Sequence, residues 1–313
     1  MHLRRNVPWR RPVVAIALAT ALGSGSAVAQ QATGAGGDWT AVDEVLGRKG
    51  TAQPGDVMRY GFPRADLQVT ANGVQLRPSL ALGSWLAFKR IGGGRAMMMG
   101  DLVLTEDEVA PVMHALQEGG VEQTALHNHV LGESPRVMYM HVSGHGDAAK
   151  LAQTARAALG ATRTPLDPPA SPPAAAAIDL DTAAVARALG YAGRVNGGVY
   201  QVSVPRRETI REAGREVPPA MGVATAINFQ PTGGGKAAIT GDFVMTAREV
   251  NAVIRALAEN GIEVTALHSH MLAETPRLFF MHFWANDDAV KLATGLRAAL
   301  SRTASRASTT ASR

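Results

Sequence analysis

Apolar residues recur with helical spacing at two places in the chain, and each run follows a threonine that precedes a glutamate by three residues. In such a capping box the threonine accepts from the third amide and the glutamate reaches back, so an amphipathic helix is predicted after Thr105 and after Thr246. Gly119-Gly120 and Asn260-Gly261 are expected to end the helices. The apolar positions are Val109, Val112, Met113 and Leu116, and Val250, Val253, Ile254 and Leu257.

Strand-like runs surround both helices in the same order. Before each helix, two runs enclose a glycine triplet, which predicts a hairpin, and after it come two more runs and another helix. Each copy is therefore predicted to be α+β, a mainly antiparallel sheet with helices packed on it. The runs of the first copy are 84–90, 96–103, 121–130 and 136–143 with a helix at 147–159, and the second hairpin is 224–229 and 236–244.

The two copies are similar enough to be an internal repeat. Between 100–152 and 241–293, 28 of 53 aligned residues are identical. We therefore expect a first repeat over 37–162 and a second over 179–302. Two similar units packed together are favoured over one pseudo-symmetric domain whose halves share a core, because each half is long enough for a core of its own.

The ends and the middle of the chain differ in composition from the repeats. Four arginines precede the apolar run Val13–Leu22, and Ala27-Val28-Ala29 then offers a cleavage site, which predicts a signal peptide over 1–29 and a periplasmic or secreted protein. Both the general and the twin-arginine export routes stay open. The proline- and alanine-rich segment 163–178 is expected to be a linker, and 303–313 a disordered tail.

Charge and cysteine content narrow the classes of function. The formal charge of +5 includes four arginines of the predicted signal peptide and three in 301–313, so residues 30–300 come to about −2 and no nucleic-acid partner is expected. The sequence contains no cysteine, which excludes disulfides, thiolate ligands and a lipid anchor on cysteine. No membrane anchor is expected, because no later segment has about 18 uninterrupted apolar residues.

Three histidines in each copy are the main candidates for a site. Two other histidines of the aligned stretch are not retained, whereas these occupy equivalent positions in TALHNHVLGESPRVMYMH and TALHSHMLAETPRLFFMH. Alternate residues of a strand share a face, and a register with an even residue sum places the third histidine there too, as a three-histidine site for a divalent metal requires. A structural network of stacked or hydrogen-bonded rings is the alternative. The residues are His127, His129 and His141, and His268, His270 and His282.

The loop between the second and third histidines retains charged groups. Glu133 and Glu274 are candidate metal ligands, or general bases for a metal-bound water. Arg136 and Arg277 are candidates to hold an anionic ligand or to pair with the glutamate. A salt bridge that fixes the loop is the structural alternative.

Two further features concern the surroundings of the histidines. The retained pairs Gly100-Asp101 and Gly241-Asp242 are expected to form a bend before the helix, with Asp101 as a candidate to support a metal ligand. The second copy has more aromatic neighbours, so we expect its site to be the tighter or more reactive one. These aromatic residues are Phe279, Phe280, Phe283 and Trp284.

The segment 241–293 resembles the LppY/LpqO family of exported bacterial proteins, whose hallmark is TALH-x-H followed by PR-x-x-x-x-H, often present twice. The likeness covers both copies, from Asp38 to Thr303. It implies export and a duplicated domain but little chemistry, because the family is functionally uncharacterised. Members named as lipoproteins carry a lipidated cysteine, which this chain lacks.

Three hypotheses of function follow. The first is an exported protein whose duplicated three-histidine site binds a divalent metal, zinc before copper. The second is a metal-dependent hydrolase of an anionic substrate, with Glu133 or Glu274 as base and Arg136 or Arg277 as anion ligand. The third is a metal-free periplasmic protein that binds a small molecule or serves as a scaffold. Three points stay open: whether the protein is an enzyme, whether the histidine triplets form two sites or one shared site, and the oligomeric state.

Overall fold

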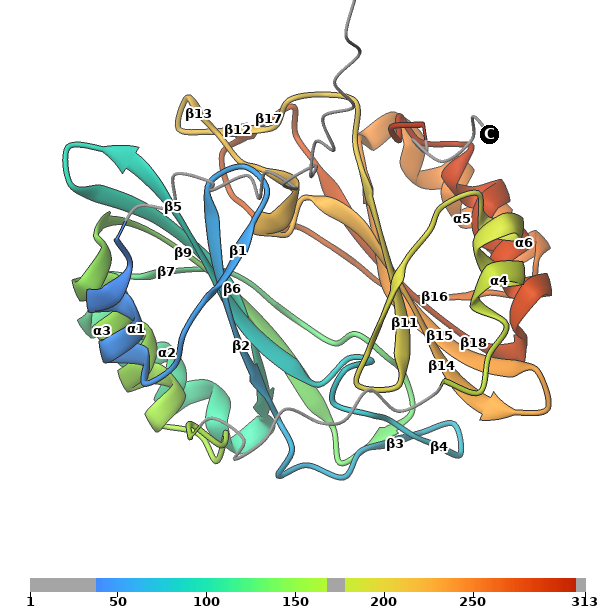
Figure 1. Ribbon diagram of the computed structural model, residues 1–313, viewed down its shortest axis with the longest axis horizontal. Helices are drawn as coiled ribbons and strands as arrows, with labels where there is room; N and C mark the ends of the chain where they lie inside the picture. Colours follow the sequence, from blue (N-terminus) through green and yellow to red (C-terminus); the bar gives the residue numbers. More distant parts are fainter. Residues whose placement is uncertain (1–37, 168–177, 308–313) are drawn as a thin grey trace, which may run out of the picture. The chain divides into compact units, whose positions relative to one another are not determined.

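The computed structural model describes residues 38–167 and 178–307, which belong to one compact unit (Figure 1). The predicted signal peptide lies outside the described residues, as do most of the predicted linker and the end of the predicted tail. No helix in the described part of the chain is both long and apolar enough to cross a membrane.

The first half builds a six-stranded antiparallel sheet in the order β1-β2-β5-β6-β9-β7, and a small sheet in the order β4-β3-β8. Figure 1 shows its helices along one face of the large sheet. The elements are α1 (Thr40–Leu46), β1 (Thr51–Gln53), β2 (Val57–Pro63), β3 (Thr70–Ala71), β4 (Val74–Gln75), β5 (Gly83–Gly92), β6 (Arg95–Thr105), η1 (Glu106–Glu108), α2 (Val109–Glu118), β7 (Glu122–His127), β8 (Glu133–Ser134), β9 (Val137–Asp147) and α3 (Ala148–Gly160).

The second half repeats this plan, with a large sheet in the order β10-β11-β14-β15-β18-β16 and a small sheet in the order β13-β12-β17. The predicted fold class, two similar α+β repeats with mainly antiparallel sheets, is therefore confirmed. The elements are α4 (Thr182–Leu189), β10 (Arg194–Asn196), β11 (Val199–Pro205), β12 (Arg211–Glu212), β13 (Arg215–Glu216), η2 (Pro219–Met221), β14 (Ala224–Gly233), β15 (Lys236–Met245), α5 (Ala247–Glu259), β16 (Glu263–His268), β17 (Glu274–Thr275), β18 (Phe279–Asp288) and α6 (Ala289–Leu300).

Both predicted capping boxes are present. The Thr105 amide donates to Glu108 at 2.9 Å, and the Thr246 amide donates to Glu249 at 2.7 Å. Each glutamate also forms an ion pair with a buried arginine, Glu108 with Arg64 at 2.6 Å and Glu249 with Arg206 at 2.7 Å. The start of each central helix is thereby tied to the end of β2 or β11.

The chain leaves the last helix of each half in the same way. The Arg163 amide donates to Glu108 at 2.8 Å, and the Ala304 amide donates to Glu249 at 2.7 Å. Ser305 then forms a bridge with the residue that follows β11. Residues just beyond the predicted ends of both repeats thus complete the capping networks.

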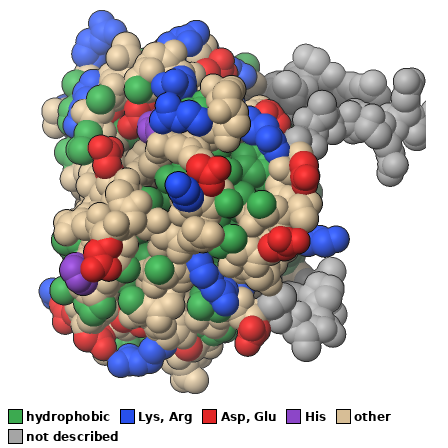
Figure 2. All heavy atoms as spheres, turned by 90° about the vertical axis from the view of Figure 1, so that its left-hand side faces the viewer, with side chains coloured by type: hydrophobic (Ala, Val, Ile, Leu, Met, Phe, Trp, Pro, Cys, Tyr) green, Lys and Arg blue, Asp and Glu red, His purple; other side chains and the backbone are tan. Residues whose placement is uncertain are grey.

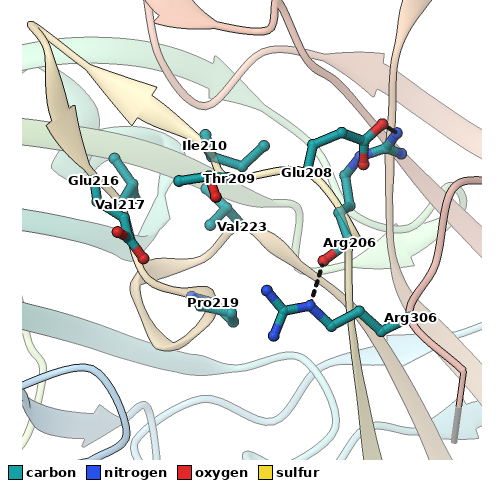
Figure 3. A pocket seen from close by; sticks show the side chains of 9 residues that line it. All are labelled: Arg206, Glu208, Thr209, Ile210, Glu216, Val217, Pro219, Val223 and Arg306. Carbon is teal, nitrogen blue, oxygen red and sulfur yellow. Dashed lines mark hydrogen bonds and ion pairs between the residues drawn. The ribbon is translucent and has the colours of Figure 1, made fainter.

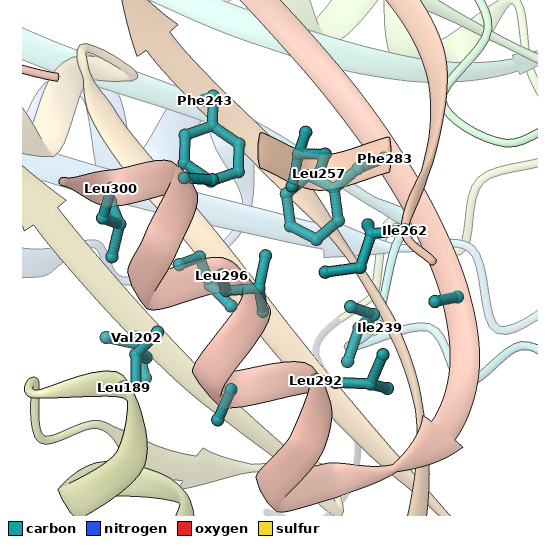
Figure 4. Close-up of a cluster of buried hydrophobic side chains, with 14 of the residues drawn as sticks. Leu189, Val202, Ile239, Phe243, Leu257, Ile262, Phe283, Leu292, Leu296 and Leu300 are labelled. Carbon is teal, nitrogen blue, oxygen red and sulfur yellow. The ribbon is translucent and has the colours of Figure 1, made fainter. Parts of the chain in front are cut away.

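Each half has its own apolar core beneath its helices. In the second half, Figure 4 shows Leu292, Leu296 and Leu300 of α6 lying toward Phe243 and Phe283 of the sheet, and all five are buried. Burying a large apolar side chain contributes about 1.5–3 kcal/mol. A matching cluster lies beneath α1, α2 and α3 in the first half.

Two further apolar clusters join the halves. In β6, Leu102 and Leu104 belong to the core beneath the helices, whereas Val103 between them belongs to a cluster that includes Val199 and Trp284 of the second half. Neighbouring strand residues point to opposite faces, so this cluster lies on the face away from the helices. A second mixed cluster includes Met97, Met99, Met271 and Phe280. Each half therefore has its own core, and two further apolar clusters contain residues of both halves.

Candidate metal centre

The strand register places the three histidines of each half together. β7 pairs with β9 so that His127 lies opposite Tyr139 and His141 lies opposite Ala125. The residue sums are even, so His127 and His141 share a face, as predicted. His129 follows β7 by two residues and stacks on the ring of Tyr139. β16 and β18 repeat this register in the second half.

The two triplets meet in one cluster at the junction of the halves. The side chain of Thr124 donates to the His270 carbonyl at 2.6 Å, and that of Thr265 donates to the His129 carbonyl at 2.5 Å, so β7 and β16 are held side by side. The six imidazole rings then form three close pairs, and each pair contains one ring from the first half and one from the second. The centroid distances are 3.6 Å for His127 and His268, 3.8 Å for His129 and His282, and 3.7 Å for His141 and His270.

Two of the three groups of side chains that can share one ion combine both halves, whereas the third lies within the second half. Among the residues that the structure describes, three groups have donor atoms within 4.8 Å of one another. This differs from the separate site expected for each half, because the sheet faces that carry the triplets face each other. The groups are His127 with His129 and His282, His127 with His141 and His268, and Asp242 with His268 and His270.

Backbone carbonyls fix the orientation of several rings. The Nδ1 atom of His282 lies 2.7 Å from the Gly241 oxygen, and Nδ1 of His127 lies 2.9 Å from the Asn128 oxygen. A carbonyl only accepts, so these Nδ1 atoms carry the proton and Nε2 keeps a lone pair. The Nε2 atoms of His127, His129, His141 and His282 are buried without a hydrogen-bond partner.

Burial favours the neutral form of five of the six imidazoles by lowering their pKa values. It lowers the pKa of His127 to about 3, with a further contribution from nearby His282. It also lowers the pKa values of His129, His141 and His268. A charged imidazolium loses its hydration on burial, and the adjacent rings would repel a second positive charge. The lone pairs that a metal ion requires are therefore present at neutral pH.

The bend predicted at Gly100-Asp101 and Gly241-Asp242 is wrong, because both pairs lie within the long strands β6 and β15. Glycine and aspartate are common in turns, which favoured the incorrect interpretation. A Cβ atom at Gly100 would lie 2.7 Å from the Trp85 oxygen, and one at Gly241 would lie 2.0 Å from the Ala226 oxygen, so close strand packing requires both glycines.

The two aspartates lie beside the third histidines, since Asp101 pairs with His141 and Asp242 with His282 across the sheet. Asp242 Oδ2 is 2.9 Å from His270 Nε2, whereas Asp101 Oδ2 is 3.8 Å from the equivalent nitrogen of His129. Burial raises the pKa of Asp101 to about 7. Burial also opposes ionisation of Asp242, but His282 and His270 outweigh it and lower the pKa of this carboxyl.

The retained glutamates bind the loop backbone and belong to none of the three donor groups. Glu133 accepts from the Val137 amide at 3.0 Å, and Glu274 accepts from the Leu278 amide at 2.8 Å. In both halves the loop contains a cis proline, Pro135 or Pro276. The carboxylates therefore hold the loop that leads into β9 or β18.

The retained arginines differ between the halves. Arg277 donates to Glu274 and to the Met271 carbonyl, both at 3.2 Å. Arg136 is exposed and lies 3.7 Å from Glu106. Arg277 thus takes part in the loop network, as the structural alternative proposed, whereas Arg136 faces solvent.

The aromatic neighbours are less different between the halves than the sequence suggested. Phe280 stacks on His270 at 3.5 Å between centroids, and Tyr139 stacks equivalently on His129 at 3.2 Å. Phe283 belongs to the core beneath the helices instead. At the rings, the aromatic difference is the Tyr139 hydroxyl, which is buried without a hydrogen-bond partner.

A shallow pocket elsewhere in the second half shares no residue with the histidine cluster. Figure 3 shows Arg306 donating to the Arg206 carbonyl at 2.9 Å at one side, with Ile210 and Val217 at the other. Arg206 is already paired with Glu208 and Glu249. On the face drawn in Figure 2, basic and acidic side chains are interspersed. The histidine cluster is therefore the stronger candidate site.

Sequence reasoning underestimated the aspartates. Asp242 was not considered as a ligand, although retention of Asp101 and Asp242 in both copies was the signal that could have identified them. The third histidine of each half was found because its spacing and retention pointed to the same face.

Fold and site define a duplicated α+β protein with a histidine cluster shared by its two halves. The chain belongs to the family described as Domain of Unknown Function (DUF1259), which matches it twice, over residues 40–161 and 183–302. This family match does not name the LppY/LpqO family, so the resemblance to that family stays a prediction.

Similarity to other known proteins is slight. No curated protein is significantly similar to the chain in sequence. Among solved structures, the chain is similar to a trimeric bacterial microcompartment shell protein, PduB, at 15% identity and a TM-score of 0.21, with 80% of this chain and 90% of that chain covered. At this TM-score the likeness supports no inference about fold, assembly or function.

Proposed function

We propose that this protein is an exported protein that binds divalent metal, zinc or copper, in the histidine cluster between its halves. The observation that carries the proposal is the set of four buried Nε2 atoms without hydrogen-bond partners, on His127, His129, His141 and His282. Leaving one buried polar atom unsatisfied costs about 1–3 kcal/mol. A metal ion bound to these lone pairs removes that cost.

His270 supports the same conclusion through its two nitrogens. Its Nδ1 lies 3.1 Å from the Gly222 carbonyl, which can only accept, so Nδ1 carries the proton. Its Nε2 lies 2.9 Å from Asp242 Oδ2 and 3.1 Å from His268 Nε2. A neutral His270 would therefore direct its lone pair at a carboxylate, and either a second proton or a cation must separate them.

The donor types favour zinc or copper. Imidazole nitrogens bind both ions well, and copper is the tighter binder in the divalent series. Zinc accepts histidine and carboxylate ligands together without requiring thiolate, and this chain has no cysteine.

A metal-free binding or scaffolding protein is the second candidate. The stacked ring pairs that join the halves favour it, because such contacts hold two surfaces together without an ion. The hydrolase hypothesis receives less support, since Glu133 and Glu274 bind backbone amides at 3.0 and 2.8 Å. Export rests on the sequence of residues 1–29, and N-terminal sequencing of periplasmic or secreted protein tests it.

Metal analysis of protein purified without a polyhistidine tag tests the proposal. We expect zinc or copper in the protein as isolated or after reconstitution, and a lower melting temperature when a chelator is added. The variant His127→Ala should bind less metal than the wild-type protein. The matched control His114→Ala should keep it, because His114 is an exposed residue of α2 whose side chain pairs with Glu118. Metal content near zero that does not rise after zinc or copper is added back would overturn the proposal and favour the metal-free candidate.

A further inference from the structure

Two of the donor groups have no residue in common. One consists of His127, His129 and His282, and the other of Asp242, His268 and His270. Groups that share no ligand can be filled at the same time. Taking the proposed metal binding as given, we infer that the cluster holds two metal ions per chain in two chemically different sites, one with three imidazoles and one with two imidazoles and a carboxylate.

The first site takes its ligands from both halves. His127 and His129 come from the end of β7 and the residues after it, and His282 comes from β18. All three Nε2 atoms are buried without a hydrogen-bond partner. Three neutral imidazoles form the donor set that zinc and copper prefer, so this site is expected to select these ions over ions that prefer oxygen ligands.

The second site has the shorter donor distances. His270 Nε2 lies 2.9 Å from Asp242 Oδ2 and 3.1 Å from His268 Nε2. Two ligands that are each about 2.0–2.1 Å from one ion, at an angle of about 90–110°, lie about 3 Å apart. These atoms are therefore spaced as ligands of one ion, and within residues 38–167 and 178–307 no lysine or arginine forms an ion pair with Asp242.

The two sites should differ in metal preference. Two histidines and one carboxylate leave coordination positions open, and this set is used by iron(II) and other ions that accept oxygen ligands. A carboxylate oxygen is also a better donor than a third imidazole for manganese(II). The second site is thus expected to bind Mn²⁺ or Fe²⁺ as well as zinc, whereas the first discriminates against Mn²⁺.

The equivalent carboxylate of the first half does not form a matching third site. Asp101 Oδ2 lies 3.8 Å from His129 Nε2. The guanidinium of Arg59, which stacks on Trp85 at 4.0 Å, also acts electrostatically on Asp101. Gln201 replaces Arg59 at the equivalent position of the second half. Asp101 therefore has a permanent counter-charge, whereas Asp242 faces histidines.

Counting bound zinc by native mass spectrometry tests the inference with the matched variants Asp242→Asn and Asp101→Asn. Reconstituted wild-type protein should carry two ions, Asp101→Asn two, and Asp242→Asn one. His129→Ala should also carry one ion, because it removes a ligand of the first site alone. Circular dichroism establishes that each variant is folded.

Titration with Mn²⁺, followed by electron paramagnetic resonance, assigns the remaining sites. We expect Mn²⁺ to bind to the wild type and to His129→Ala. In Asp242→Asn the affinity for Mn²⁺ should fall by at least about tenfold, because even the loss of a residue that only supports a metal ligand costs about that much. One ion in the wild type, or equal ion counts in both aspartate variants, would overturn the two-site inference while leaving metal binding intact. No ion in any protein would instead overturn the proposed function.

Discussion

Asp101 and Asp242 occupy equivalent strand positions in the two halves, but only the Asp242 carboxylate lies within hydrogen-bonding distance of a histidine ring. Its carboxylate is 2.9 Å from His270, against 3.8 Å for Asp101 and His129. The strands, glycines and ring stacking around the two residues correspond closely. The difference lies in their neighbours, since Asp101 feels Arg59 and the second half has Gln201 there. The two copies share their donor residues, and the difference between Arg59 and Gln201 gives the two aspartates different electrostatic surroundings.

Acid should produce the largest effect on the metal-free protein. Burial lowers the pKa values of five histidines of the cluster, so below about pH 6.5 the unfolded chain takes up protons that the folded chain does not. The free energy of unfolding should therefore fall with decreasing pH, by about 1.4 kcal/mol per pH unit for each histidine. Urea unfolding at pH 7, 6 and 5 measures this, and equal stability at pH 7 and 5 would contradict it.

The aspartates should separate the halves in the same experiment. The pKa of Asp101 is raised to about 7, so its contribution to stability is present at low pH and is lost as the pH rises from about 4 to 7. Asp101→Asn should thus steepen the loss of stability on acidification, by up to about 1.4 kcal/mol per pH unit. The pKa of Asp242 is lowered, so its contribution is lost only below about pH 4. Equal slopes for Asp101→Asn and Asp242→Asn above pH 4.5 would remove the asymmetry.

The buried arginines, unlike the aspartates, should have equal effects on stability in both halves. Arg64 binds Asp66 and Glu108, and Arg206 binds Glu208 and Glu249, all at 2.6–2.8 Å. Removing one partner of a buried ion pair costs about 3–5 kcal/mol, because the remaining charge is buried without compensation. Arg64→Met and Arg206→Met should each lower the free energy of unfolding by that amount, with metal stoichiometry unchanged in the folded protein. A difference of more than about 2 kcal/mol between them would show that the frameworks are not equivalent.

The loop glutamates should give the smallest effects. Burial raises the pKa of Glu133 to about 7, so Glu133→Gln replaces a group that is partly neutral and should change stability little. Glu274 pairs with Arg277 at 3.2 Å, so Glu274→Gln should cost about 1 kcal/mol. Thermal melts with metal analysis measure both, and neither variant should change the metal content. Loss of an ion from either would restore these glutamates as ligands.

The elements and the faces of the histidines could be predicted because they depend on local pattern. Capping boxes at Thr105 and Thr246 marked the helices, and the even register of β7 with β9 put His127 and His141 on one face. His129 was expected on the same strand but lies beyond its end at His127. The grouping of His127 with His282 could not be predicted in this way. It depends on how two sheets face each other, which is determined by apolar residues distributed over both halves, such as Val103 and Trp284.

Asp242 shows a second limit of the sequence. A glycine followed by an aspartate is typical of turns, yet Gly241 lies within a strand. Glycine is required at this position because a Cβ atom there would lie 2.0 Å from the Ala226 carbonyl oxygen. This tertiary requirement leaves no trace in the local pattern. Only the retention of the glycine–aspartate pair in both copies pointed to a role for it.

The central claim, that one metal ion is held jointly by both halves, is tested most directly by anomalous X-ray scattering from zinc in crystals of the reconstituted protein. We predict a zinc peak about 2.0–2.1 Å from nitrogens of His127, His129 and His282, with ligands from both halves. Data collected on either side of the zinc absorption edge identify the ion. Peaks bound only by His127, His129 and His141, or only by His268, His270 and His282, would contradict the claim and restore one independent site for each half.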